Sequence, residues 1–297
     1  MGIQVLWDRA YHIKPISIRD GILTGKSQLE ESFEIELEVC RPLLCNIKFY
    51  PYRNDHADFY VIFPYDVDVE GVHEIPFPEF ESRFPLAAAY LNRHRARIES
   101  EVDTLPRKFP DQYADEHWHL FTRVQNHGAT YPKVLTPMTA MDTFATVTFS
   151  DNAYCDNANV YFMQLPEITN ENLYALSAII NSTMFSVLAR SIANPQSNGY
   201  FKFNKQFLDP VPFPSENFRT NKDGFVYQLA DVAQEIAGQQ QRYFTASPAQ
   251  KRTLSGTLQR NWSRIDDLVY RLYQLTDSEI AEFECRGRNV NRIEMLD

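Results

Sequence analysis

The chain has few glycines, few cysteines and no long apolar run. Only 10 of its 297 residues are glycine, and no Gly-x-Gly loop follows an expected strand, which argues against a cofactor-binding loop. Its four cysteines, Cys40, Cys45, Cys155 and Cys285, form no Cys-x-x-Cys pair. We therefore expect free thiols in a reducing cytoplasm rather than a zinc site or a disulfide framework.

Membrane and secretion signals are also lacking. No apolar run approaches the ~18 residues that would cross a bilayer. The N-terminus shows no basic segment followed by an apolar one, as a secretory signal would. These observations predict a cytoplasmic protein with no membrane partner.

Positive charge is scarce. The net charge is −10, from 29 Lys and Arg against 39 Asp and Glu, and residues 1–80 alone hold 14 acidic against 7 basic residues. Such a balance disfavours general nucleic-acid binding. Clustered phosphate contacts can still form on an acidic protein, but we expect it to bind DNA only weakly and without sequence preference when it is alone.

What is present favours a folded mixture of helices and strands. Hydrophobic residues make up 44% of the chain, with 21 Phe and 16 Tyr, which is enough for a sizeable core. Periodicity predicts helices over 28–44, 84–102 and 170–192, and from 224 onward with a break at Ser247–Pro248. Runs rich in Thr, Val, Phe and Tyr predict strands over 58–65, 117–124, 133–138, 143–149 and 159–165. We expect a mixed α/β (α+β) fold, with a β-rich domain with flanking helices at 1–215 and a helical subdomain at 216–297.

Catalytic motifs are missing. No Gly-x-Ser-x-Gly elbow and no His-Glu-x-x-His helix occurs, and no Asp, Glu and Lys stand at nuclease spacing. His117 and His119 would share one face of an expected strand, where a metal site competes with a solvated face. We expect a protein that is not an enzyme by itself, with no catalytic, cofactor-binding or metal-binding residues.

Two polar segments carry candidate binding residues. The first lies between two expected strands and continues to a lysine: Arg123, Gln125, Asn126, His127 and Lys133. The second follows a helix and surrounds Gly199: Asn194, Gln196, Asn198, Lys202 and Lys205. Arg and the amide side chains suit base edges, whereas Lys suits phosphates.

Each segment also has a plainer interpretation. The first resembles any polar hairpin in composition. In the second, Tyr200, Phe201 and Phe203 fit a core, with the polar residues capping the preceding helix; both interpretations can hold, because alternate strand residues face opposite ways. Arg93, Arg95 and Arg97 fan over a helix surface and are either solvated or a reserve of phosphate contacts.

The order of these motifs resembles the C-terminal specificity (target-recognition) domain of TaqI-like and type IIG adenine-N6 DNA methyltransferases. The central match is Asn198-Gly199-Tyr200-Phe201-Lys202-Phe203 before Val211-Pro212-Phe213-Pro214, preceded by a helix with Ile180-Asn181-Ser182. Further matching segments are Ile18 to Gly25, Phe59 to Tyr65, Pro85 to Glu101, Trp118 with Arg123, Lys133 to Pro137, and Arg264 to Ile280.

The resemblance covers the specificity half of such enzymes. The Asp/Asn-Pro-Pro-aromatic tetrapeptide that holds the target adenine is absent, since Asn194-Pro195 continues with Gln196-Ser197. The resemblance thus implies a module of a restriction-modification or phage-defence methylase that recognises a double-stranded DNA sequence. S-adenosylmethionine and catalysis would belong to a separate catalytic adenine methyltransferase domain or subunit.

The alternative is an assembly subunit that docks a methylase or nuclease partner without reading DNA. Its support is the acidic charge balance and the apolar spacing of Ile265, Leu268 and Leu272, which predicts packing of the C-terminal helices against each other.

Overall fold

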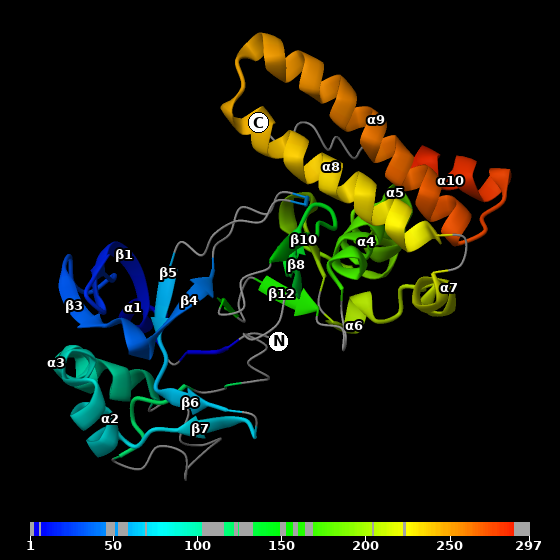
Figure 1. The fold of residues 1–297 in the computed structure, drawn as a ribbon. Coiled ribbons are helices and arrows are strands. Elements are labelled where there is room, and N and C mark those ends of the chain that lie inside the picture. Colours follow the sequence, from blue (N-terminus) through cyan, green and yellow to red (C-terminus); the bar gives the residue numbers. More distant parts are fainter. Residues whose placement is uncertain are drawn as a thin grey trace. The chain divides into compact units, whose positions relative to one another are not determined.

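The computed structural model spans residues 1–297 and describes residues 3–5, 7–45, 51–52, 59–68, 70–102, 116–121, 124, 133–148, 153–156, 160–163, 169–203, 205–221 and 224–287. The chain mixes helices and strands, which confirms the mixed α/β fold class (Figure 1). It divides into two compact units. Unit 1 comprises Met1–Asn46, His56–Tyr131 and Ser150–Val160, and unit 2 comprises Ile47–Asp55, Pro132–Phe149 and Tyr161–Asp297.

This division does not follow the boundary expected after residue 215. Helix α4 (Asn170–Ile180) packs along α8 (Phe225–Thr245), and α5 (Thr183–Ile192) packs against α10 (Asp277–Gly287). Elements on either side of residue 215 therefore share one hydrophobic core. The C-terminal helices are part of unit 2 rather than a subdomain with a core of their own.

Unit 1 is built on a mainly antiparallel sheet with strand order β11-β4-β5-β1-β2-β3. Its strands are β1 (His12–Arg19), β2 (Ile22–Lys26), β3 (Phe33–Glu36), β4 (Cys40–Leu44), β5 (Phe59–Ile62) and β11 (Tyr154–Cys155). Only the β11–β4 pair is parallel among these. A short helix α1 (Asp8–Tyr11), a 3-10 turn (Leu37–Val39) and the hairpin of β6 (Tyr65–Val67) and β7 (Val72–Glu74) accompany the sheet.

The helix expected over 28–44 is wrong, because this segment forms β3 and β4. Phe33 and Ile35 are buried while Glu34 between them is exposed, which is the alternation of a strand paired with β2. Pro42 lies inside β4 opposite Tyr60, at a position where it would have broken a helix. The helical spacing of apolar residues was therefore the weaker signal.

Two helices complete unit 1: α2 (Phe77–Arg83) and α3 (Pro85–Val102). The helix predicted over 84–102 is confirmed, although Leu86 is exposed instead of buried. Glu36 accepts hydrogen bonds from the backbone N–H groups of Leu86 (2.8 Å) and Ala87 (3.0 Å), so a strand residue caps the first turn of α3. The strand expected over 117–124 is not formed at 117–120, which is a turn closed by Leu120 N donating to His117 O at 3.0 Å.

Unit 2 holds two small sheets. One has the order β10-β8-β12, from β10 (Thr146–Thr148), β8 (Lys133–Pro137) and β12 (Val160–Met163), which confirms the strands expected around these positions. The other has the order β13-β14-β9, from β13 (Asn194–Pro195), β14 (Phe201–Lys202) and β9 (Thr139–Ala140). Short helices α6 (Lys205–Leu208) and α7 (Ser215–Thr220) follow.

The single helix expected over 170–192 is two helices, α4 and α5, bent by 61° at residues 181–182. Thr169 caps α4, its hydroxyl accepting from Asn172 N, and Ser182 caps α5 by accepting from Phe185 N. Among the described residues no single helix is long and apolar enough to cross a membrane; α4 and α5 approach that only as this bent pair. All four cysteines are free thiols, as predicted.

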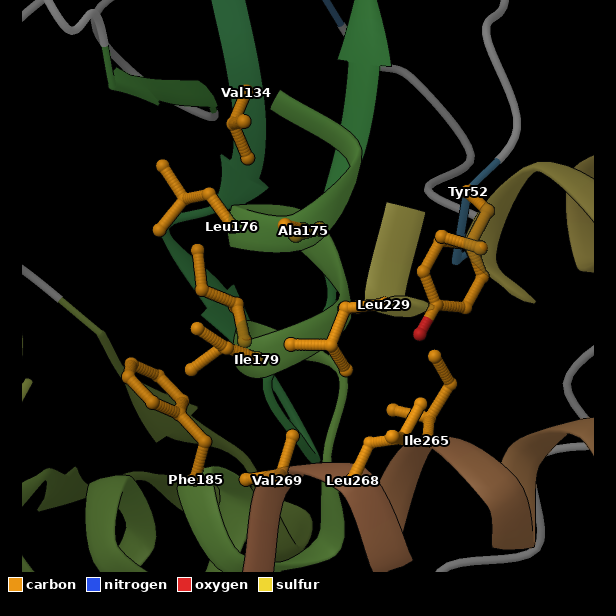
Figure 2. Close-up of a cluster of buried hydrophobic side chains, with 14 of the residues drawn as sticks. Tyr52, Val134, Ala175, Leu176, Ile179, Phe185, Leu229, Ile265, Leu268 and Val269 are labelled. Carbon is orange, nitrogen blue, oxygen red and sulfur yellow. The ribbon is translucent and has the colours of Figure 1, made fainter. Parts of the chain in front are cut away.

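The C-terminal helices pack against each other, as predicted. Helix α8 ends before Ala246, and α9 (Pro248–Leu272) begins after Ser247, which together with Gln250 forms a capping box. Figure 2 shows Leu229 of α8 and Ile179 of α4 in one cluster, with Ile265, Leu268 and Val269 of α9 directed into it. Three helices thus supply most of the unit 2 core.

Candidate nucleic-acid interface

The β13–β14 hairpin is the described part of the second polar segment. Helix α5 ends at Ile192, and the extended backbone of Ala193 leads directly into β13. At the tip, Asn198 (φ 60°) and Gly199 (φ 79°) adopt the left-handed conformation, which Gly and Asn enter more readily than other residues. Gln196 N donates to Tyr200 O at 2.7 Å and closes the turn. The Asn-Gly pair therefore sets the turn, as the sequence indicated.

The strand register places the candidate side chains on one face of the sheet. Asn194 pairs with Lys202, and Lys202 pairs with Thr139 across the three strands. Gln196 and Tyr200 lie two residues from Asn194 and Lys202, and therefore on the same side. We call this set the outer face; its members are Asn194, Gln196, Tyr200, Lys202, Thr139 and Met141, which lies opposite Tyr200.

The opposite face of the same sheet is packed into the core at β14 and β9, whereas Pro195 of β13 is exposed. Phe203 and Ala140 are buried, and Phe201 packs against the same cluster. The expectation of a core is therefore confirmed for Phe203 and in part for Phe201. It is wrong for Tyr200, which is exposed, because residue 200 has the opposite strand parity to residues 201 and 203. The polar residues do not cap α5, whose last turn is closed by Ala193 N donating to Ala189 O.

The turn between α4 and α5 is hydrogen-bonded to the segment that follows β9. Asn181 Nδ2 donates to Ala145 O and Asn181 Oδ1 accepts from Ala145 N, both at 2.8 Å, in the manner of a strand pair. Thr143 Oγ1 adds a bond to Ile180 O at 3.1 Å. The Ile180-Asn181-Ser182 part of the resemblance therefore has a structural role: it ties the segment after β9 to the helices.

The outer face offers polar atoms that the protein itself leaves open. Within the described part of the chain, the side chains of Asn194, Asn198 and Lys202 make no hydrogen bond or ion pair, whereas Gln196 Nε2 donates only to the adjacent Pro195 O at 3.1 Å. The face carries the cation of Lys202 and two amide groups, with the third amide, Asn198, exposed at the tip. Such groups suit an anionic ligand that also has hydrogen-bonding edges.

The other two lysines differ from Lys202. Lys205 is exposed on α6 and forms an ion pair with Asp209 one turn later; such a surface pair is worth about 0–1 kcal/mol, so the ammonium group remains available to an anion. Lys133 is 1% exposed, and its Nζ lies 5.5 Å from the centroid of the Phe162 ring. The position of Lys133 is therefore unsuited to the phosphate contact expected for it.

The first polar segment lies outside the described residues. Arg123, Gln125, Asn126 and His127 all belong to the part of the chain that the structure does not describe. The prediction that they contact base edges stays a prediction.

Three arginines of α3 were considered above as further phosphate contacts: Arg93, Arg95 and Arg97. Each interacts with another side chain of unit 1. Arg93 forms an ion pair with Glu30 (Nε to Oε1, 3.0 Å), and Arg95 pairs with Glu99 (Nε to Oε1, 2.7 Å) while lying over Trp118. Arg97 lies over the ring of Trp7. As for Lys205, surface ion pairs worth about 0–1 kcal/mol leave a phosphate contact possible, so these arginines stay a reserve.

His117 and His119 do not share the strand face expected for them, because residues 117–120 form a turn. His119 is buried among Phe77, Phe80 and Trp118, and burial lowers its pKa to about 3, so it is neutral at physiological pH. His117 Nε2 lies 3.9 Å from Glu74 Oε2. Among the described residues no group of three or more His, Cys, Asp or Glu side chains is arranged to hold a metal ion.

Three residues of the outer face were not predicted from the sequence to be binding residues. Thr139 and Met141 come from β9 and its end, and their proximity to residues 200–202 depends on a pairing across about sixty positions of sequence. The plainer interpretation placed Tyr200 in the core with Phe201 and Phe203, although residue 200 has the opposite strand parity. Comparison with known proteins adds nothing here: no protein-family model matches this chain, and no curated protein matches it either.

Proposed function

We propose that the chain is a DNA target-recognition module of a restriction-modification or phage-defence adenine methyltransferase. The observation that carries the proposal is the outer face, where Asn194, Gln196 and Lys202 lie together beside the exposed Asn198. This arrangement adds to the resemblance to TaqI-like specificity domains, which rests on the same residues. The catalytic domain and its S-adenosylmethionine belong to a separate chain or segment.

The amide groups and the lysine of the outer face suit different parts of DNA. An Asn or Gln amide pairs in two-point fashion with the N6 and N7 edge of adenine and discriminates between bases by about 1–3 kcal/mol. Lys202 supplies a phosphate contact that is blind to sequence. The exposed Lys205 can join it by exchanging Asp209 for a phosphate.

The acidic charge of the chain limits what this face does alone. With a net charge of −10, the protein repels DNA outside its contact surface. We therefore expect weak binding by the isolated chain and tight binding only when the catalytic partner adds its own contacts. Arg123, Gln125, Asn126 and His127 remain part of this proposal as further contacts to bases.

The test is binding of the purified chain to randomised duplexes over a salt series that starts at about 50 mM. Lys202→Ala should weaken binding to all sequences alike and reduce the salt slope by about one. Asn194→Ala and Gln196→Ala should instead change which sequences are enriched when the chain binds together with its adenine methyltransferase partner. The control is Lys26→Ala, which removes the same charge from an exposed position on β2 in unit 1.

Two outcomes would contradict the proposal. One is the absence of duplex binding by the wild-type chain at low salt, with and without an adenine methyltransferase partner. The other is a salt slope that Lys202→Ala and Lys26→Ala leave equally unchanged.

A second candidate function is docking of a protein partner through α8. Tyr227 of α8 is 60% exposed, the largest value among the exposed large hydrophobic side chains of the described residues. A chain that binds no duplex but forms a stable complex with a methylase, and loses that complex in Tyr227→Ser, would favour this candidate.

A further inference from the structure

The outer face has an apolar part that base-edge and phosphate contacts do not use. Phe201 pairs with Ala140, and the next residues outward along the two strands are Tyr200 and Met141. Tyr200 is 41% exposed and Met141 is 54% exposed. Within the described residues no aromatic ring contacts Tyr200. Phe201 and Phe203, which have the opposite strand parity, are packed inward.

We propose that Tyr200 and Met141 form a stacking surface for a nucleobase that has lost a stacking neighbour in bound DNA. The inference deepens the proposed function and rests on it. Base–aromatic stacking is tolerant of sequence, since every base presents a π-face. The pair would therefore add affinity at one opened step of the duplex, while the neighbouring amides read base edges.

The surroundings favour a nucleic acid as the occupant. Lys202 lies on the same face two residues after Tyr200, at a suitable position for the phosphate of a stacked nucleotide. The adjacent carboxylate does not oppose this anion: Asp142 is buried, accepts from Thr143 N at 2.9 Å, and lies 4.0 Å from Arg190 Nε. Two apolar side chains also cover far less area than a stable protein–protein interface requires.

The geometry of duplex DNA explains why the base must be unstacked. Inside an intact duplex each base face is covered by its neighbours, and only the edges face the grooves. An adenine methyltransferase turns its target base out of the helix, and the bases on either side of the gap then lose a stacking partner. The exposed ring of Tyr200 offers a replacement for that partner.

The experiment compares a perfectly paired duplex with the same duplex carrying one abasic site, using wild-type chain at low salt. We expect the wild-type protein to bind the abasic duplex more tightly and to change the fluorescence of a 2-aminopurine placed beside the gap. Tyr200→Ala should reduce the preference for the abasic duplex by about tenfold, whereas Tyr200→Phe should keep it. Met141→Ala should cause a smaller loss in the same direction.

The matched control is Phe213→Ala, which removes another exposed aromatic ring of unit 2. Thermal unfolding of each variant establishes that it is folded. The inference is overturned if Tyr200→Ala keeps the wild-type preference, or if it weakens binding to both duplexes equally. A wild-type protein that binds neither duplex would instead refute the proposed function, so the two failures are distinct.

Discussion

The paired arginines of unit 1 and the outer face of unit 2 use their polar groups in different ways. In unit 1, Arg83 pairs with Asp66 and Glu79, and Arg93 pairs with Glu30. In unit 2, the amides of Asn194 and Asn198 and the cation of Lys202 make no such contact within the described part of the chain. Paired charges stabilise a fold modestly, whereas unpaired exposed groups are free to bind a ligand. This contrast supports the outer face of unit 2 as the candidate interface.

The two cores differ as well. Unit 1 contains an aromatic network in which Phe63 contacts Tyr65, Phe121 and Tyr154. Unit 2 is held by aliphatic side chains between helices, as Ile179, Leu229 and Leu268 illustrate (Figure 2). Both units nevertheless use a distant carboxylate to bind a helix start: Glu36 for α3, and Asp266 for α5, where it accepts from Thr183 N at 2.7 Å.

The largest effect should come from charging the helix core of unit 2. Leu268→Asp places a carboxylate without a partner among buried side chains, which costs several kcal/mol. We expect loss of much of the helical circular-dichroism signal and a lower Tm. The control is Gln259→Asp, at an exposed position of the same helix. A Leu268→Asp variant with the wild-type Tm would contradict the burial of Leu268 between α8 and α9.

The same Gly→Ala change should have opposite signs in the two units. In unit 1, a Cβ at Gly25 would lie 2.3 Å from Ile13 Cγ2 and 2.9 Å from Leu23 Cδ2, so Gly25→Ala should destabilise by about 1–3 kcal/mol. In unit 2, Gly238 lies in α8 with nothing within 4 Å of such a Cβ, so Gly238→Ala should stabilise by about 0.5–1 kcal/mol. Chemical denaturation measures both; equal effects would remove this contrast.

The smallest effect concerns the ion pairs of unit 1. The hydrogen bond from Arg93, followed by that from His94, lowers the pKa of Glu30 below its ordinary value of 4.5. Because the folded-state pKa is depressed, this contribution is present above pH 4.5 and is lost as the pH falls through the folded-state pKa. Glu30→Gln should lower stability near neutral pH by less than about 1 kcal/mol.

The measurement for this pair is Tm as a function of pH. The difference between wild-type protein and Glu30→Gln should shrink as the solution becomes more acidic. Glu31→Gln removes the neighbouring exposed carboxylate and serves as the control, since we expect it to leave the wild-type pH dependence in place. A constant difference at every pH would mean that Glu30 does not act through its charge.

Local patterns in the sequence determined several elements of this protein. The 84–102 helix, the Thr169 cap, the break at Ser247–Pro248 and the turn at Gly199 all follow from propensity, capping and left-handed backbone preference, which act over a few residues. The inward orientation of Phe203 followed in the same way from strand alternation.

Only the tertiary structure decided which of these residues meet. Three features depend on contacts between segments far apart in the chain. These are the pairing of Lys202 with Thr139, the burial of Lys133 and the position of the Arg95 guanidinium over the Trp118 ring. A lysine has the same side chain whether it is buried or exposed, and an apolar spacing over 28–44 fits a helix until β2 supplies a strand partner. The free energy of these long-range contacts outweighs local preference, so the composition of a segment alone cannot tell which polar groups remain free to bind.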